Sequence, residues 1–166
     1  QALVERAGVG KGHKVFVQAG SGGVGSFAIQ LAKHLGATVA TTTSTANVDL
    51  VKGLGAHVVV DYKTQDFAHV LRDYDVVLHS GDKSALEKSV GVLRPGGKLI
   101  SISGPPDPAF GRQSGWLLEQ ICRVLSHGIR KKAKQRGVDY SFLFMRPDGA
   151  QLSQIGALVD AGVIRP

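Results

Sequence analysis

Short apolar runs of strand length alternate with segments of helical periodicity from one end of the chain to the other. The strand-like runs are residues 14–19, 38–42, 58–60, 75–78, 98–103 and 139–145. Apolar residues recur at helical spacing in residues 23–35, 47–54, 84–93, 114–132 and 149–161. Strands that alternate with helices pair in parallel, and right-handed crossovers place the helices over both faces of the sheet. The sequence therefore predicts an α/β fold built on one parallel sheet.

A glycine-rich turn joins the first predicted strand to the first predicted helix. It reads Gly20-Ser21-Gly22-Gly23-Val24-Gly25, a G-x-G-x-x-G pattern in the strand–turn–helix context of dinucleotide sites. The first glycine permits a tight turn, the second lets the backbone approach a diphosphate, and the third lets the helix pack on the strand. We therefore predict a Rossmann fold, a doubly wound six-stranded parallel sheet in the order 3-2-1-4-5-6. A chain of 166 residues has the length of one domain, so we predict a single NAD(P)-binding domain spanning residues 1–166.

The end of the second predicted strand indicates which dinucleotide is bound. NAD sites usually place Asp or Glu there to hold the ribose hydroxyls. Residues 41–47 instead carry five hydroxyl side chains and Asn47, with no acid before Asp49. Because hydroxyls and amides can donate to a 2′-phosphate that a carboxylate would repel, this segment favours NADP(H). The nearest cations are Lys52 and Lys63, and capping of the next helix by Ser44 or Thr45 is a compatible alternative.

The net charge of +7 raises the question of a polyanionic partner. Much of the excess lies in residues 130–136, which we interpret as a solvated helix end stopped by Gly137. The alternatives are a polyanion-binding patch or a face toward another domain. One basic turn without interleaved aromatic residues is a poor nucleic-acid signature, so we expect no nucleic-acid partner. No apolar run approaches the ~18 residues of a membrane span, so we expect no membrane partner.

The single cysteine, Cys122, excludes an intrachain disulfide and a cysteine-built zinc site within this segment. It lies in an apolar-periodic stretch, so we expect it to be buried. A reducing, cytoplasmic location fits this composition, and the first residues do not resemble a signal peptide. The chain lacks an initiator Met and starts and ends abruptly, so we expect an excised segment of a longer protein.

Four further motifs carry a family resemblance. They are Ala-Gly-Ser-Gly-Gly-Val-Gly at 19–25, Ala-Ile-Gln-Leu-Ala-Lys at 28–33, Leu-Gly-Ala at 54–56 with Asp-Tyr-Lys at 61–63, and Leu-Arg-Pro-Gly-Gly-Lys-Leu at 93–99. Together they resemble the medium-chain dehydrogenase/reductase superfamily, and its zinc-independent quinone oxidoreductase (zeta-crystallin-like) branch most closely. The resemblance implies a two-domain enzyme that transfers hydride from NADPH to a quinone or an α,β-unsaturated carbonyl. This chain would be its cofactor domain, the substrate would bind mainly to the other domain, and a homodimer could form along the fifth and sixth strands.

The resemblance also implies the residues that contact the cofactor. Ser21, Gly23 and Val24 would face the pyrophosphate. Thr43, Ser44 and Asn47 would meet the 2′-phosphate, with Tyr62 on the adenosine side. The residues expected near the nicotinamide are Leu78, His79, Ile102, Ser103, Gly104, Phe144 and Met145. These positions follow strands whose carboxyl ends should share one edge of the sheet, where such folds bind ligands.

His79 departs from the family pattern, because an acidic residue is usual at that position. It is interpreted as a loop histidine, with a nicotinamide-side acid as the alternative, and we assign this chain no catalytic residue and no metal ligand. The alternatives for the whole protein are a zinc-dependent alcohol dehydrogenase, a non-catalytic dinucleotide sensor, and a binder of acidic partners. The segment alone is expected to bind cofactor without turnover, since it holds no Ser-His-Asp set or paired carboxylates.

Overall fold

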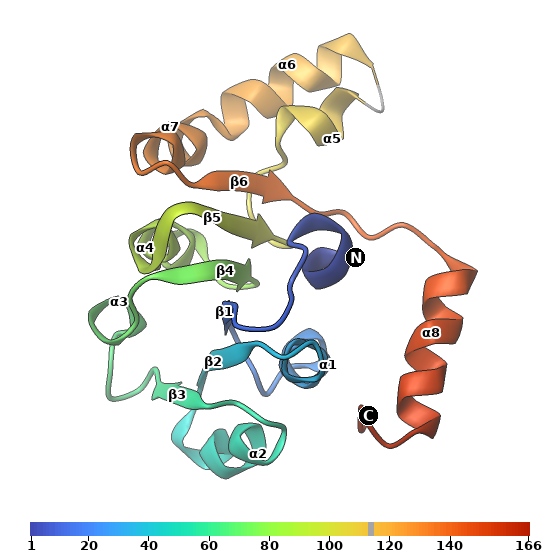
Figure 1. The fold of residues 1–166 in the computed structure, drawn as a ribbon. Helices are drawn as coiled ribbons and strands as arrows, with labels where there is room; N and C mark the ends of the chain where they lie inside the picture. Colours follow the sequence, from blue (N-terminus) through green and yellow to red (C-terminus); the bar gives the residue numbers. More distant parts are fainter. Residues whose placement is uncertain (113–114) are drawn as a thin grey trace.

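The structure, a computed structural model that describes residues 1–112 and 115–166, contains a six-stranded sheet. Its strands are β1 (Lys14–Val17), β2 (Thr38–Thr43), β3 (Val58–Asp61), β4 (Tyr74–His79), β5 (Leu93–Ser101) and β6 (Asp139–Phe142). All neighbouring strands are parallel, and their order is β3-β2-β1-β4-β5-β6 (Figure 1). The predicted Rossmann order is therefore confirmed.

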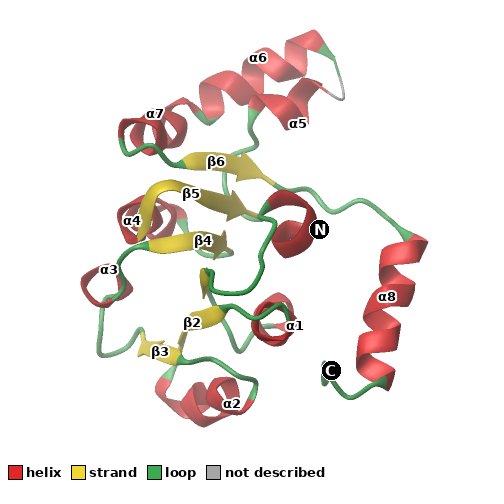
Figure 2. Cartoon of the chain, viewed as in Figure 1, coloured by secondary structure: helices red, strands yellow, loops and turns green. Residues whose placement is uncertain are grey.

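Two short helical turns and eight α-helices connect and cover the strands in the described part of the chain. They are η1 (Ala2–Arg6), α1 (Gly23–His34), η2 (Thr45–Asn47), α2 (Val48–Gly53), α3 (Phe67–Val70), α4 (Lys83–Val92), α5 (Pro108–Arg112), α6 (Trp116–Leu125), α7 (His127–Gln135) and α8 (Gly149–Asp160). Figure 2 shows η1 and α1 on one side of the sheet and α3, α4 and α7 on the other. None of the described helices combines the length and apolarity needed to cross a bilayer.

The core consists of two apolar layers, one on each face of the sheet. Successive side chains of a strand point to opposite faces, so Val15 and Val17 of β1 pack with η1 and α1, whereas Phe16 packs with α3, α4 and α7. All three side chains are fully buried. Burial on both faces explains why the central strands β1 and β4 contain continuous apolar runs instead of alternating patterns.

Three predicted elements differ from the structure by three or more residues at a boundary. The helix expected over residues 114–132 is two helices, α6 and α7, that meet at Ser126; residue 114 itself lies outside the described residues. The buried Ser126 hydroxyl donates to the carbonyl oxygen of Cys122 at 2.6 Å, which closes α6 on itself. The sixth strand ends at Phe142 instead of Met145, because Leu143 donates the last ladder bond, to the Ser101 carbonyl oxygen.

The fifth strand also starts earlier than predicted, at Leu93, so the expected turn at residues 95–97 lies within it. Its register against β4 shifts between Tyr74 and Val76, which accommodates the Pro-Gly-Gly segment as an irregularity of the strand. Two short helices, α3 and α5, were not predicted. The α5–α6 pair lies beyond β6 at one end of the sheet (Figure 1).

Candidate cofactor-binding site

The turn between β1 and α1 is so tight that a side chain at two of its glycines would overlap neighbouring atoms, which are backbone atoms at Gly25 and side-chain atoms at Gly20. A Cβ on Gly25 would lie 2.2 Å from the carbonyl oxygen of Ala19, and a Cβ on Gly20 would lie 2.1 Å from Thr41 Oγ1. Ala19 itself adopts a left-handed conformation with φ 51°. A Cβ on Gly23, in contrast, would meet nothing within 4 Å, so the turn is open on its outer side.

The start of α1 leaves backbone donors available to an anion. Gly22 is the N-cap residue and provides no side-chain acceptor, and the first turn contains no acid. The N-caps of α4 and α8, in contrast, are Asp82 and Asp148, whose carboxylates accept backbone N–H bonds. Residues 21–24 are exposed. Free N–H groups and the positive end of the helix dipole fit a diphosphate held in this cradle.

The carboxyl end of β2 lies beside the glycine turn, as predicted. Thr43 Oγ1 donates to Ser21 Oγ at 3.0 Å, and Asn47 Nδ2 donates to Ser44 Oγ at 3.3 Å. The backbone of Ala19 donates to Thr42 Oγ1 at 3.1 Å, a supporting contact that the sequence reasoning missed. The structure thus brings Ser21, Thr43, Ser44 and Asn47 together at one edge of the sheet.

An acid that the sequence reasoning missed also lies at this edge. Asp61 ends β3, directly beside Thr43 in the strand register. Its carboxylate accepts from the Thr45 hydroxyl at 2.5 Å and from the Lys63 backbone N–H at 2.9 Å, and the Thr45 hydroxyl lowers the pKa of Asp61. Only the β2–β3 register brings Asp61 here. Tyr62, the next residue, is exposed, as an adenosine contact would require.

The two predicted nicotinamide-side residues at the end of β4 are buried. Leu78 belongs to the apolar layer on the α1 face, and His79 is 1% exposed. Neither offers a free side-chain surface to a ligand. The neighbouring loop after β5 is more open, since Ser103 is exposed and Ile102 and Gly104 are half-buried.

His79 fastens the loops that follow β4 and β5. Its Nε2 lies 3.0 Å from the Asp82 carbonyl oxygen, which can only accept, so Nε2 carries the proton. Its Nδ1 lies 2.8 Å from Ser101 Oγ and 3.4 Å from Ser103 Oγ. Ser101 Oγ already accepts from the Gly104 backbone N–H at 2.7 Å, so the Ser101 hydroxyl donates to Nδ1. Ser101 is a second supporting residue that the sequence reasoning missed.

Burial lowers the pKa of His79, while the contacts with Asp82 oppose that shift. The neutral ring is the form that this hydrogen-bond arrangement requires, because a protonated Nδ1 would have to face a hydroxyl that already points its hydrogen toward it. His79 therefore fixes the position of Ser103 directly and that of Gly104 through the Ser101 hydroxyl. The prediction of a loop histidine is wrong, because His79 is the buried last residue of β4.

Phe144 and Met145, the predicted carboxamide-side residues, are exposed in the segment that follows β6. Phe144 packs on Phe110 of α5, with 5.7 Å between the ring centroids. Beyond Met145, the side chain of Gln1 forms two hydrogen bonds with the backbone of Arg146. Gln1 Nε2 donates to the Arg146 carbonyl oxygen at 2.8 Å, and the Arg146 N–H donates to Gln1 Oε1 at 3.2 Å. This pairing fixes the path of the chain after β6.

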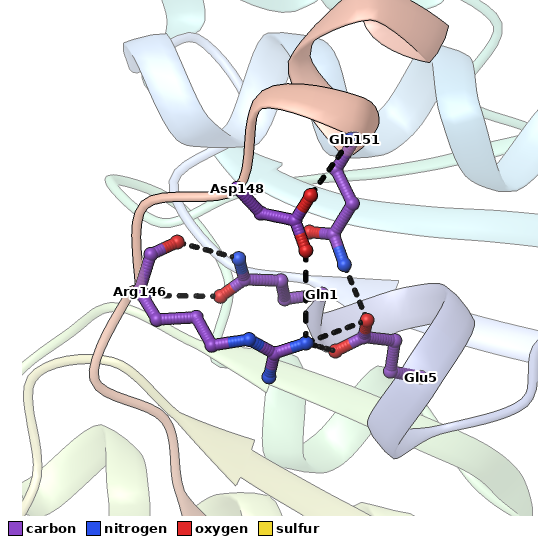
Figure 3. Close-up of polar contacts among 5 residues, drawn as sticks. All are labelled: Gln1, Glu5, Arg146, Asp148 and Gln151. Carbon is purple, nitrogen blue, oxygen red and sulfur yellow. Dashed lines mark hydrogen bonds and ion pairs between the residues drawn. The ribbon is translucent and has the colours of Figure 1, made fainter.

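A polar network links this segment to both η1 and α8 (Figure 3). The Arg146 guanidinium contacts both carboxylate oxygens of Glu5, at 3.0 and 3.1 Å, and lies 3.9 Å from the Asp148 carboxylate. Gln151 of α8 also donates to Glu5. Glu5 is therefore the common acceptor that joins three parts of the chain.

Neither a cluster of potential metal ligands nor an accessible thiol occurs among the described residues. Within residues 1–112 and 115–166, no three His, Cys, Asp or Glu side chains gather as a potential metal site. Cys122 is a free thiol with 1% exposure, so its predicted burial is confirmed.

Known proteins share this fold and much of this sequence. A 2-methylene-furan-3-one reductase from Solanum lycopersicum is 41% identical over 84% of this chain and 37% of its own length. A mitochondrial NAD(P)H oxidoreductase, RTN4IP1, from Danio rerio is 32% identical over 99% of this chain and 45% of its own. The structure of a quinone oxidoreductase from Coxiella burnetii superimposes with a TM-score of 0.81 at 27% identity, covering 99% of this chain and 46% of that one.

The chain thus spans less than half the length of these relatives. One relative is named mitochondrial, so the cytoplasmic location stays a prediction for this chain. A family model described as zinc-binding dehydrogenase matches residues 54–166, from the end of α2 to the last residue. The chain belongs to this zinc-binding dehydrogenase family, within the medium-chain dehydrogenase/reductase superfamily of oxidoreductases, and carries its Rossmann-type part.

Proposed function

We propose that this chain binds NADP(H) for an oxidoreductase that transfers hydride from NADPH to a quinone or an α,β-unsaturated carbonyl. The observation that carries the proposal is the β1–α1 turn, where Gly20 and Gly25 exclude any side chain and the start of α1 has no side-chain cap. Bound there, the cofactor supplies the hydride, and the chain's role is to hold and orient it.

The Gly22 N–H already donates to the Ala19 carbonyl oxygen at 2.9 Å, so the backbone N–H groups of Gly23 and Val24 hold the diphosphate, and Ser21 adds a hydroxyl donor. The Thr43 hydroxyl contacts the Ser21 hydroxyl, so the group that would bind the diphosphate lies next to the group that would bind the adenosine ribose. At the far end, Ser103 and Gly104 contact the nicotinamide ribose. Phe144 and Met145 shield one side of the nicotinamide from water, which protects the hydride donor during transfer.

Specificity for NADP(H) over NAD(H) depends on the 2′-position of the adenosine ribose. Thr43, Ser44 and Asn47 provide neutral donors there. The Asp61 carboxylate is the one feature that opposes this proposal, since it lies in register with Thr43. Two of its acceptor sites are engaged by Thr45 and Lys63, which reduces its repulsion of a phosphate without removing its charge.

Names of the relatives support the proposed substrate class. The Solanum lycopersicum protein is named for a methylene ketone, an α,β-unsaturated carbonyl, and the Coxiella burnetii protein for quinones. Both acceptors are electron-poor and take hydride at carbon or oxygen. We propose that the reaction needs no metal, and that the substrate is bound mainly by a second domain in the longer protein.

Side-by-side fluorescence titration with NADPH and NADH tests the cofactor proposal. NADPH should bind at least tenfold more tightly, and Asp61→Asn should tighten NADPH further, because it removes a negative charge near the phosphate. Equal or NADH-favouring affinity would overturn the phosphate argument. Loss of both affinities in Gly23→Val would assign the binding to the glycine turn, since the larger side chain would occupy the open outer side of the turn, where a Cβ meets no neighbouring atom within 4 Å.

The reductase proposal needs a separate test in the complete protein. Reduction of quinones or enals with NADPH, followed by the fall in NADPH absorbance, should be detectable there and absent from residues 1–166 alone. A complete protein that binds NADPH tightly but reduces neither class would instead be a dinucleotide sensor.

A further inference from the structure

One face of α6 is apolar and exposed. Its members are Trp116, Leu117, Ile121, Val124 and Leu125, which we call the α6 apolar face, and their exposed fractions run from 46% to 75%. The opposite side of α6 is closed: Cys122 is buried there, and the backbone at Leu118 and Glu119 lies against Gly111 of α5. Five large apolar side chains on one helix form a patch of the kind that marks an interaction surface.

The charge of the chain is concentrated beside this face. Residues 112–136 contain seven Arg or Lys and one acid, Glu119, whereas the rest of the chain contains thirteen Arg or Lys and twelve acids. Almost all of the net charge of +7 therefore belongs to α6 and α7 and the residues next to them. The single acid is neutralised locally, since Glu119 pairs with Arg112 at 3.0 Å and with Arg123 at 3.1 Å.

The cations of α7 are directed outward. This helix buries Ile129 and Ala133 against the sheet, while Lys131, Lys132 and Lys134 are exposed. Within the described residues, Lys132 pairs with Glu87 of α4, and no ion pair involves Lys131 or Lys134. The cations adjoin the apolar face, because Leu125 and Lys132 line the same hollow of about 540 Å³.

An apolar stripe with a tryptophan at one end and a dense set of cations alongside is the arrangement of helices that lie in a membrane interface. Tryptophan favours that interface, and each Lys or Arg gains attraction from anionic headgroups. We propose that α6 and α7 dock on an anionic lipid surface, with the α6 apolar face entering the interface and the cations of α7 contacting lipid phosphates.

Charge favours this occupant over a second copy of the chain. A symmetric pairing through the α6 apolar face would bring together two copies of residues 112–136, each with seven cations and one acid. That arrangement costs free energy, whereas an anionic bilayer neutralises the excess cations. Nucleic acid would engage the cations but leave the apolar side chains in water. Leu152 and Ile155 of α8 are also exposed and apolar, but no cations of the same helix lie beside them, since α8 contains no Lys or Arg.

The earlier expectation of no membrane partner rested on the absence of a spanning segment, and a peripheral surface needs none. Docking of this kind is independent of the proposed cofactor and reaction. It would leave the bound protein on one leaflet, released by salt, and would bring an enzyme for apolar quinones or enones to the phase where such compounds dissolve.

Co-sedimentation with vesicles of phosphatidylcholine, with and without phosphatidylglycerol, tests the proposal in the full chain at low salt. Binding should require phosphatidylglycerol and should fall steeply as sodium chloride is raised. Trp116 is the chain's single tryptophan, so a blue shift of its emission on vesicle addition reports entry of the α6 apolar face into the interface.

Two paired variants separate the two parts of the surface. Lys131→Ala with Lys134→Ala should lower the partition coefficient about 25-fold, from about fivefold for each cation. Leu117→Ser with Val124→Ser should lower it at least tenfold and abolish the membrane-dependent shift of Trp116. The matched controls are Leu152→Ser, an exposed apolar side chain on α8, and Lys11→Ala, an exposed cation elsewhere, and neither should change binding.

Several outcomes would overturn the proposal. They are no binding to phosphatidylglycerol vesicles at low salt, binding that survives both paired variants, or binding without any change in Trp116 emission. A dimer in sedimentation equilibrium that Val124→Ser converts to monomer would assign the face to a second copy instead. Trp116 that acrylamide cannot quench in the complete protein would assign it to another part of that protein.

Discussion

Two glycines in the β1–α1 turn differ in whether the folded chain leaves room for a side chain. Gly23 and Gly25 lie two residues apart at the start of the same helix. A Cβ would meet the Ala19 carbonyl oxygen at 2.2 Å from Gly25, but nothing within 4 Å from Gly23. Gly25 is therefore required by the packing of the turn itself, whereas the folded chain leaves room for a side chain at Gly23.

Gly25→Ala is expected to lower the free energy of unfolding by about 2–3 kcal/mol, because the backbone must shift to admit the methyl group. Gly23→Ala is the matched control and should change it by less than about 1 kcal/mol. Urea denaturation of both variants provides the measurement. Equal destabilisation by the two substitutions would contradict the close approach at Gly25.

His79 makes stability sensitive to mild acid. Burial lowers its pKa in the folded state below the ordinary value of 6.5, so the unfolded chain takes up a proton first as the pH falls. The stability is thus complete above the unfolded pKa and decreases below it, by at most about 1.4 kcal/mol per pH unit, until the folded pKa is reached. His79→Asn should flatten the dependence of unfolding free energy on pH between 7 and 5. Parallel curves for both proteins would exclude His79 as the cause.

At the scale of elements, α8 is held to the rest of the molecule mainly by contacts at its two ends. It has no buried residue, and Figure 3 shows that polar contacts join its first turn to η1. Its other end is held by the buried Ile164 and by Gln30, whose side-chain amide pairs with the backbone of Arg165 at 2.8 and 3.0 Å. Exposed polar contacts contribute little to global stability, so α8 should open without unfolding of the sheet.

Glu5→Ala removes the shared acceptor of Arg146 and Gln151. Amide hydrogen exchange should rise several-fold in residues 143–160 and stay unchanged in the sheet strands, with less than about 1 kcal/mol lost in global stability. Glu87→Ala, which breaks a comparably exposed ion pair with Lys132, serves as the control and should leave α8 unaffected. Unchanged protection of α8 in the Glu5 variant would mean that its attachment depends on other contacts.

The sequence predicted the elements that local pattern determines. β1 and β4 were recognisable because burial on both faces makes them largely apolar, whereas the Thr-rich β2 and the mixed β6 carry less of this signal. The glycine turn was recognisable because the spacing of its glycines matches one backbone geometry. The break at Ser126 was missed because helical periodicity continues through it, and only the bond to Cys122 ends α6. Asp61 and Ser101 were missed because each reaches the site through the register of a neighbouring strand, which local patterns do not determine.

At the scale of the whole molecule, the sheet ends at two edge strands, β3 and β6. Leu143 donates its N–H to β5, so the alternation of a strand directs the Phe142 N–H away from the sheet. The buried Asp107 carboxylate accepts that N–H at 2.8 Å and the Phe110 N–H at 2.9 Å. The loop before α5 thus covers part of the β6 edge, which opposes pairing of β6 with another strand.

Asp107→Ala should therefore do more than destabilise. Loss of two N–H···carboxylate bonds should cost about 3 kcal/mol of unfolding free energy, and the freed Phe142 N–H should exchange rapidly and leave β6 able to add a strand. Sedimentation velocity should then show concentration-dependent self-association of Asp107→Ala, but not of Asp107→Asn, which keeps an acceptor oxygen.

If the native chain already dimerises through β6, its Phe142 amide must be bonded across the interface, and protection of that amide would depend on protein concentration. Protection that is independent of concentration and is lost only in the alanine variant would identify Asp107 as the group that closes this edge.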